Sequence, residues 1–310
     1  MIDFIRKQQV MEIEGIKLGG RVGEYPTVLI GSIFHKGDKK VKDEKKGIFD
    51  KKKVEELVFL QKELSDKSGN PCMLDIAGTS EIALQKYVEF ITEVSKDLFL
   101  LNAVSSEMRI NLMKYINEIG LSSRAIYTSI NYTLNEEEIK GIFESKAETV
   151  VIQSFNPHNP RISGMSTILD GDKNKEGLID KAKRAGVKKL LLFTSIFEIP
   201  SIGVAGRAIY QLKERFGYPT GTAPVGVIGR WSINNPHFKG NFKSACEAAG
   251  IALVLAMGAD FIIYGTLEKA EHTFPSTAIV DAMIRRNSKM TFRHKFDSKN
   301  HPLSKLYFPL

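Results

Sequence analysis

The chain of 310 residues is 43% apolar and carries a formal charge of +8 at pH 7, from 44 Lys and Arg against 36 Asp and Glu. Much of the excess positive charge lies in residues 36–53, where acidic residues are interspersed, as is typical of a solvated loop rather than a nucleic-acid surface. Residues 1–10 lack the apolar core of a signal peptide, and the apolar stretch 248–259 is too short to span a bilayer. Cys72 and Cys246 suit a reducing compartment and lack metal-ligand spacing. We therefore expect a cytoplasmic protein without membrane insertion, nucleic-acid partner or metal site.

An alternation of apolar and polar residues over 10–18, broken at Glu14-Gly15, predicts a β-hairpin ahead of the main fold. Eight short apolar runs follow and predict buried strands, with helical patterns between them, several of which end at a glycine. The predicted strands are 27–34, 72–78, 98–104, 125–131, 149–155, 189–196, 221–227 and 260–265. The predicted helices are 51–66, 80–95, 105–120, 135–146, 174–185, 201–216, 238–257 and 272–286.

The predicted strands follow one another at a spacing of about 33 residues, near the size of a strand plus its crossover helix. Eight such units, with strands buried on both faces, predict an α/β fold consisting of a single (β/α)8 TIM barrel. An open doubly wound sheet is the alternative. The expected organisation is an N-terminal hairpin in residues 1–26, the barrel in 27–287 and a C-terminal tail packed on the barrel in 288–310.

In such a barrel the functional side chains lie at the C-terminal ends of the strands. Those predicted ends carry one clear carboxylate among amides and hydroxyls. A metal hydrolase needs several His, Asp or Glu there, and a Schiff-base aldolase needs a Lys inside the mouth, so both classes are excluded. The side chains at these ends are Ser32, His35, Asp75, Asn102, Ser129, Asn131, Gln153, Asn156, Thr194, Ser195 and Tyr264, with Pro224 and Gly226 after the seventh strand.

One carboxylate among amides suits an uncharged, flat heterocycle with many donors and acceptors. An ionised Asp75 can accept two parallel hydrogen bonds from a ring N–H and an adjacent exocyclic amine, and a pterin presents this pair of donors. The structural alternative for Asp75 is a helix cap or a salt bridge. For Asn102, Asn131 and Asn156 the alternative is a loop-forming Asn that bonds its own backbone.

Six motifs in the same order resemble the H-subunit family of tetrahydromethanopterin S-methyltransferase, and the resemblance covers nearly the whole chain. It implies a barrel enzyme that moves a methyl group between N5 of a reduced pterin and the cobalt of a corrinoid protein. It also points to the soluble bacterial members that act in glycine betaine demethylation and pass the methyl group to tetrahydrofolate. The motifs are GNPCMLD at 69–75, SIN at 129–131, FNP at 155–157, IPSIG at 199–203, RAIY at 207–210 and HPL at 301–303.

The resemblance implies that Asp75 binds the pyrimidine edge of the pterin, assisted by Asn102 and Asn131. It further implies that the corrinoid is supplied by a separate partner protein and that the chain forms a homodimer. Asn156 and Ser195 are the predicted proton network at N5. The further predicted substrate-binding residues are Ser129, Gln153, Thr194 and Gly226.

The chain departs from related barrels after the seventh strand, where they commonly carry an Asn near N5 and this chain reads Ala-Pro-Val-Gly-Val-Ile-Gly over 223–229. Proton control at N5 must therefore come from elsewhere. Three alternatives stay open: a protein of this family specific for tetrahydromethanopterin, a phosphate-binding barrel that uses Gly226, Gly229 and Gly265, and an enzyme like dihydropteroate synthase, which also holds a pterin.

Overall fold

The computed structural model describes residues 2–296 and 300–307. Its eight parallel strands close into a barrel in the order β12-β13-β14-β3-β6-β7-β8-β9, which confirms the predicted fold. The strands are β3 (Val28–Ile33), β6 (Cys72–Gly78), β7 (Phe99–Ala103), β8 (Ala125–Ile130), β9 (Thr149–Gln153), β12 (Lys189–Thr194), β13 (Thr220–Thr222) and β14 (Phe261–Thr266).

The predicted N-terminal hairpin is present as β1 (Val10–Ile13) and β2 (Ile16–Gly19). Its two turn residues, Glu14 and Gly15, have φ angles of 42° and 83°, as the tight turns that match the twist of a hairpin require. The segment before it is fixed by the Gln9 amide, which donates to the carbonyl of Gly217 at 2.8 Å. The hairpin therefore packs at the end of the helix that Gly217 terminates, α7 (Ser201–Phe216).

The chain divides into two compact units, here called the first and the second unit. The first comprises Met1–Gly31, Leu60–Cys72 and Thr194–Leu310, and the second comprises Ser32–Phe59 and Met73–Phe193. The predicted division at residues 26 and 287 stays a prediction. Across the described ranges, no helix is both long and apolar enough to cross a membrane.

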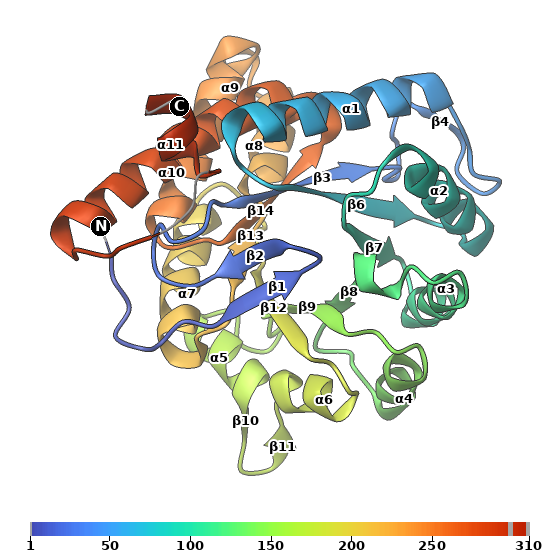
Figure 1. The fold of residues 1–310 in the computed structure, drawn as a ribbon. Helices are drawn as coiled ribbons and strands as arrows, with labels where there is room; N and C mark the ends of the chain where they lie inside the picture. Colours follow the sequence, from blue (N-terminus) through green and yellow to red (C-terminus); the bar gives the residue numbers. More distant parts are fainter. Residues whose placement is uncertain (1, 297–299, 308–310) are drawn as a thin grey trace. The chain divides into compact units, whose positions relative to one another are not determined.

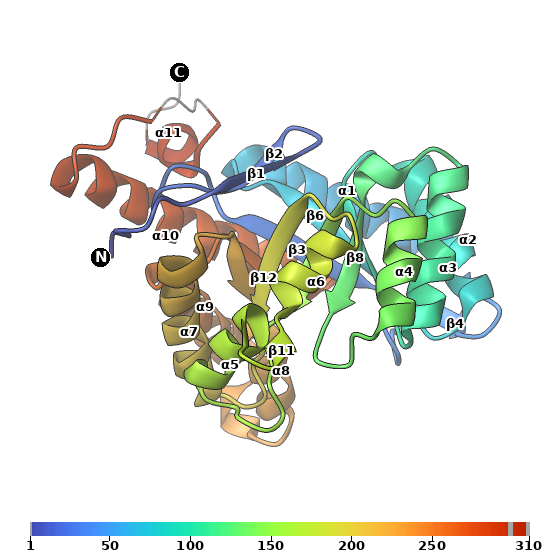
Figure 2. The same ribbon diagram turned by 90° about the horizontal axis from the view of Figure 1, so that it is seen from below.

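In the second unit three helices lie side by side, as the two ribbon views agree (Figures 1 and 2). They are α2 (Glu81–Val94), α3 (Ser106–Glu118) and α4 (Glu136–Glu144). Each begins after a polar cap, Ser80, Ser105 or Asn135, whose side-chain oxygen accepts a hydrogen bond from the amide three residues later. The predicted starts are therefore right to within one residue. This unit also contains α5 (Ile162–Asp170) and α6 (Leu178–Arg184).

Two loops of the second unit contain more structure than the sequence predicts. Residues 35–50 form a small antiparallel pair, β4 (Val41–Asp43) and β5 (Ile48–Phe49). Residues 156–173, predicted as a loop, contain α5, and the next predicted helix begins late because β10 (Gly171–Asp172) pairs with β11 (Lys175–Glu176) first. The helix α1 (Lys51–Ser68) follows β5 and matches its predicted start.

The seventh strand is where the sequence prediction is wrong. A strand was predicted over 221–227, but β13 ends at Thr222, and Pro224 is the first residue of α8 (Pro224–Ile233). Proline lacks the amide donor that a central strand needs, whereas its fixed φ suits the first turn of a helix. Gly226 therefore lies in a helix, where it is exposed. The other helices of the first unit are α9 (Asn241–Ala256), α10 (Ala270–Thr291) and α11 (Pro302–Tyr307).

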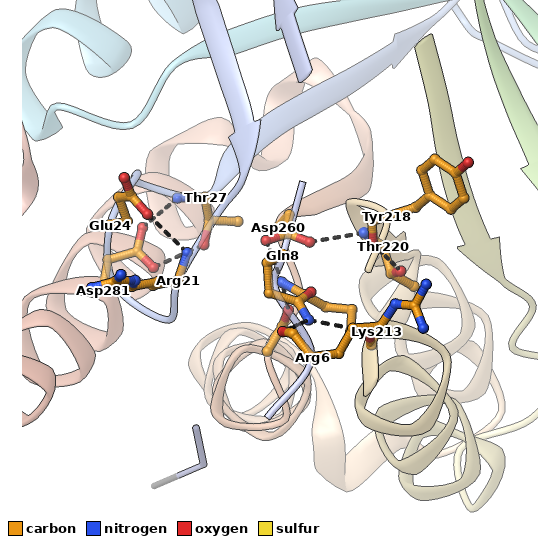
Figure 3. A network of polar contacts seen from close by, with 11 residues as sticks. Arg6, Gln8, Arg21, Glu24, Thr27, Lys213, Tyr218, Thr220, Asp260 and Asp281 are labelled. Carbon is orange, nitrogen blue, oxygen red and sulfur yellow. Dashed lines mark hydrogen bonds and ion pairs between the residues drawn. The ribbon is translucent and has the colours of Figure 1, made fainter. Parts of the chain in front are cut away.

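A buried ion pair organises the start of two strands of the first unit (Figure 3). The ammonium of Lys213, on α7, lies 2.6 Å from a carboxylate oxygen of Asp260 and donates to the carbonyl of Gly258 at 3.0 Å. The other oxygen of Asp260 accepts the amide of Thr220 at 2.8 Å. Because Thr220 begins β13 and Asp260 precedes β14, the pair fixes the entry of both strands.

A second buried carboxylate, Asp281 on α10, receives three hydrogen bonds. The amide and the hydroxyl of Thr27 donate to it at 2.8 Å each, and the side-chain amide of Asn70 donates at 2.7 Å. Burial nevertheless raises the pKa of Asp281 to about 6. Asp281 thus joins the residues that precede β3 and β6 to α10.

The C-terminal tail, predicted over 288–310, begins inside α10, which extends to Thr291, and the later α11 contacts α10. Residues 297–299 and 308–310 lie outside the described residues, and packing of the tail on the barrel stays a prediction. His301 is fully buried there, and its Nδ1 accepts the amide of Leu303 at 3.1 Å. Burial, and then the positive charges of Arg285 and Lys289, lower the pKa of His301 to about 3. The native tail therefore holds a neutral imidazole.

Replacing His301 by Asn should remove an acid sensitivity of the fold. In the unfolded chain His301 has a pKa of about 6.5, so below that pH it binds a proton, whereas in the native protein it stays neutral down to about pH 3. The contribution of His301 to the free energy of unfolding is therefore full above pH 6.5 and falls as the pH drops toward 3. Between pH 7 and pH 5 wild type should lose about 2 kcal/mol more than the variant. The loss would be measured by urea unfolding, with exposed His158→Asn as control. Equal pH dependence of wild type and His301→Asn would contradict this. The raised pKa of Asp281 changes the pH dependence of stability in the opposite direction. It does so by the same amount in wild type and variant, so it cancels in the difference between them.

Candidate functional site

Asp75 is a buried carboxylate with one oxygen free for a ligand. It is the fourth residue of β6 and is 4% exposed, so it lies inside the strand, whereas the sequence predicts it at the strand's end. The hydroxyl of Ser32, on β3, donates to Oδ2 at 2.7 Å. Within residues 2–296 and 300–307, no hydrogen-bond donor meets Oδ1. A buried acceptor without a donor is costly, and a ligand N–H would relieve that cost.

The electrostatics of Asp75 favour a ligand that donates. Burial raises the pKa of this carboxyl, whereas Ser32, Asn102 and the charge of His35 act to lower it. The effect of burial is the largest of these, so the isolated site disfavours the charged form. Donors from a bound heterocycle would shift that balance toward the carboxylate.

Strand register places three predicted site residues on one face of the sheet. In the parallel ladder Ala77 is opposite Asn102, and Asn102 is opposite Thr128, so Asn102 shares a face with Asp75, two residues before Ala77. Thr128 is opposite Val151, before the register between β8 and β9 shifts, and Gln153, two residues after Val151 in β9, falls on the same face. Asn102 is exposed and Gln153 is half-buried. Asp75, Asn102 and Gln153 thus lie on one face of the sheet. In this order, each lies further toward the C-terminal ends of the strands than the one before.

Asn131 and Asn156 are used by their own loops. Oδ1 of Asn131 accepts the amide and the hydroxyl of Thr133, at 2.9 and 2.7 Å. Oδ1 of Asn156 accepts the amide of His158 at 3.0 Å, and its amide donates weakly to the carbonyl of Gly164 at 3.4 Å. The side-chain oxygens of both residues therefore bond their own loops, as in the loop-forming alternative. The side-chain amide of Asn131 could still donate to a ligand. Ser129 is half-buried where the register between β8 and β9 shifts.

Three predicted site residues belong to the first unit, whereas the group around Asp75 comes from the second. Thr194 is fully buried, and its hydroxyl donates to the carbonyl of Gly221 at 3.4 Å. Its own carbonyl accepts the hydroxyl of Thr222 at 2.6 Å. Ser195 follows β12 and is buried, and Gly226 is on α8. Thr194 therefore joins strands with both of its polar groups.

The loop after β3 supplies a residue that the predicted site omits, His35, whose side chain is 40% exposed. Its Nδ1 lies 3.7 Å from Asp38, a buried carboxylate that accepts the amide of Phe34 at 3.0 Å and the ammonium of Lys40 at 2.8 Å. Although burial acts to raise the pKa of Asp38, its contacts with His35 and Lys40 hold that pKa well below the usual range. The signals for Ser32 and His35 were their places at the end of a predicted strand.

Removing the Asn102 amide should weaken pterin binding selectively. The Asn102→Ala variant should lose about 1–2 kcal/mol of binding free energy, or about 5- to 30-fold in affinity, because a donor beside Asp75 is missing. Its melting temperature should stay unchanged, since the residue is exposed. Asn102→Asp should bind still more weakly, because two neighbouring carboxylates resist joint ionisation. Calorimetry measures both variants, and wild-type affinity in Asn102→Ala would show that Asn102 takes no part in binding.

The part of the chain that the structure describes contains no group of three or more His, Cys, Asp or Glu placed to hold a metal ion. The polar groups near Asp75 are hydroxyl, amide and imidazole side chains, which bind by hydrogen bonding. The arrangement can therefore hold and orient a ligand with donor groups, while no side chain in it is set up as an activated nucleophile.

Comparisons with known proteins agree on the family and on the fold. Residues 6–293 match the family described as tetrahydromethanopterin S-methyltransferase MtrH subunit. The chain is 34% identical to the H-subunit of this enzyme from Methanothermobacter thermautotrophicus and 35% identical to that from Methanocaldococcus jannaschii, over 99% of this chain and 100% of each relative. The H-subunit of a putative methyltransferase, mtx, from Methanosarcina acetivorans is 35% identical over 92% of this chain and 93% of its own length.

Among solved structures, dihydropteroate synthase from Yersinia pestis has the same fold, with a TM-score of 0.55 at 13% identity over 89% of this chain and 99% of its own. At that identity the likeness concerns the fold alone. The family assignment rests instead on the full-length sequence matches, which span hairpin, barrel and much of the tail. The chain belongs to the MtrH family of methyltransferases, named after the MtrH subunit of tetrahydromethanopterin S-methyltransferase.

Proposed function

We propose that this protein transfers a methyl group between a methyl-corrinoid protein and N5 of a reduced pterin, with tetrahydrofolate as the acceptor. The observation that carries the proposal is the free Oδ1 of buried Asp75 in a chain of this family. The ring N–H and the exocyclic amine of a pterin are adjacent donors, which matches what a carboxylate can accept. Asp75 would hold this edge, and Asn102 would flank it.

In this reaction the lone pair of N5 attacks the methyl carbon, the bond from carbon to cobalt breaks with its electron pair on cobalt, and the proton of N5 is released to water. The chain would contribute positioning, for which good orientation alone is worth up to about 7–11 kcal/mol of barrier. Asp75 would fix the ring while the partner protein brings the methyl group. Asn156 and Ser195 are proposed as the proton network at N5, since attack needs a free lone pair and the reverse step needs a protonated N5.

The remaining proposed contacts of the pterin are Ser129, Asn131, Gln153, Thr194 and Gly226. We propose that the chain acts as a homodimer in the pathway class that demethylates glycine betaine. A second candidate is a protein that uses tetrahydromethanopterin, because the full-length relatives are H-subunits of tetrahydromethanopterin S-methyltransferase.

Calorimetric titration of the full chain with tetrahydrofolate and with tetrahydromethanopterin tests this function. Tighter binding of tetrahydrofolate supports the first candidate, and tighter binding of tetrahydromethanopterin supports the second. The protein and the bound pterin are then mixed with methylcob(III)alamin, and the formation of cob(I)alamin is followed by absorbance. A chain that binds neither pterin contradicts the proposal. A chain that binds one without transfer from free methylcobalamin is tested again with a methyl-corrinoid protein, and failure there contradicts it as well.

A further inference from the structure

Three buried residues, Arg109, Tyr127 and Glu138, form a cluster near the end of β7, the strand that carries Asn102. We call them the Arg109 cluster. The guanidinium of Arg109, on α3, donates to the carboxylate of Glu138, on α4, at 3.1 Å. The hydroxyl of Tyr127, on β8, donates to the same oxygen at 2.5 Å. The guanidinium also lies 5.3 Å from the centroid of the Tyr127 ring. The cluster thus joins β8, α3 and α4 around one shared oxygen.

The cluster reaches the end of β7 through a backbone contact. Another guanidinium nitrogen of Arg109 donates to the carbonyl of Ala103 at 3.1 Å. Ala103 is the last residue of β7 and directly follows Asn102. The two residues that lead from it into α3 are Val104, which is exposed, and Ser105, which caps the helix. Arg109 is therefore the side chain that fixes the strand end immediately after Asn102.

We propose that Arg109 is a positioning residue for the pterin, which holds the end of β7 so that the Asn102 amide stays directed at Asp75. This inference rests on the proposed function. A fixed donor loses less conformational freedom on binding than a mobile one, so it supports a tighter complex. Glu138 and Tyr127 orient the guanidinium, because a planar fork bonded at two ends has one favourable orientation.

The opposite end of β7 offers a matched control for this inference. The guanidinium of Arg124 donates to the carbonyls of Ser95 and Asp97, at 2.8 and 2.9 Å, and lies 5.6 Å from the ring of Phe99. It thus grips the start of β7 with the same chemistry that Arg109 uses at the end. Both arginines share a general role in folding, whereas Arg109, unlike Arg124, contacts the residue that directly follows Asn102.

The experiment compares Arg109→Met/Glu138→Gln with Arg124→Met by thermal melting and by calorimetry with whichever of tetrahydrofolate and tetrahydromethanopterin wild type binds more tightly. The double substitution removes both buried charges, so that neither is left unpaired. We expect it to lower pterin affinity about threefold to tenfold, within the range seen for residues that act on a site without contacting its ligand. We expect Arg124→Met to retain wild-type affinity at a similar melting temperature, and Arg109→Lys to recover part of the lost affinity.

A double-mutant cycle makes the inference specific. If Arg109 acts through Asn102, adding the Arg109→Met/Glu138→Gln change to Asn102→Ala causes no further loss of affinity. Fully additive losses, or equal losses in the Arg109 and Arg124 variants, would overturn the inference while leaving the proposed function intact. If wild type binds neither pterin, both the proposed function and this inference fail. If the Arg109 variant does not fold, Arg109→Lys carries the same comparison, and wild-type affinity in that variant at a lowered melting temperature also overturns the inference.

Discussion

Replacing Asp75 by Asn is expected to lower the affinity for the reduced pterin about 100-fold, or by about 3 kcal/mol. Two charge-assisted hydrogen bonds are lost, and the new amide group can turn a donor toward donors of the ligand. Stability should hold or rise, because the variant no longer buries a carboxylate with an oxygen that lacks a partner. Calorimetry measures the affinity, and urea unfolding measures the stability.

The matched control for Asp75 is Asp260→Asn, which alters another buried carboxylate, in the first unit. It should lower stability while leaving pterin affinity at the wild-type value. An Asp75→Asn affinity within a factor of about two of wild type would remove Asp75 from the binding site, because losing even one ordinary hydrogen bond costs about as much as that factor or more.

The largest expected loss of stability follows replacement of Lys213 by Met. Among the described residues, the Thr220 amide would then be the remaining hydrogen-bond donor to buried Asp260, and burial already acts to raise the pKa of this carboxyl. Breaking one side of a buried ion pair typically costs about 3–5 kcal/mol. Urea unfolding at pH 7 measures this loss.

The double variant Lys213→Met/Asp260→Asn distinguishes the cause. If the loss comes from the unpaired charge, the second substitution restores a substantial part of the stability, because no buried charge is left. If the double variant is as unstable as Lys213→Met, the lost hydrogen bond to Gly258 and the contact of Lys213 with the ring of Phe4 are responsible instead.

The barrel was predictable because its strands are buried on both faces and because polar residues mark the starts of several helices in the sequence. Ser80, Ser105 and Asn135 are polar residues with side-chain oxygens at the starts of the predicted helices, and each caps its helix. The seventh strand was not predictable from apolar content. An apolar helix turn and a buried strand share that content, and Pro224 was the only local sign of the difference.

The residue types of the candidate site follow from the sequence, whereas the contacts of these residues do not, and their role in binding stays a prediction. Asp75 stands out in sequence because a carboxylate in an apolar run is rare, and the structure places it in a buried position with an unused oxygen. Asn102 and Asn131 look alike in sequence. Only tertiary structure separates the one beside the carboxylate from the one whose oxygen is bonded to Thr133, because a hydrogen bond to a residue two positions on competes with a ligand.

The position of Asp75 bears on discrimination between cofactors. If Asp75 binds the pterin as proposed, it would not discriminate between tetrahydrofolate and tetrahydromethanopterin, because the pyrimidine edge that the carboxylate would bind is common to both. What differs between these two cofactors lies beyond that edge, in the substituents and side chain of the reduced ring. A lineage could therefore change its one-carbon carrier by altering the residues that surround the side chain of the cofactor, while the buried carboxylate stayed as it is.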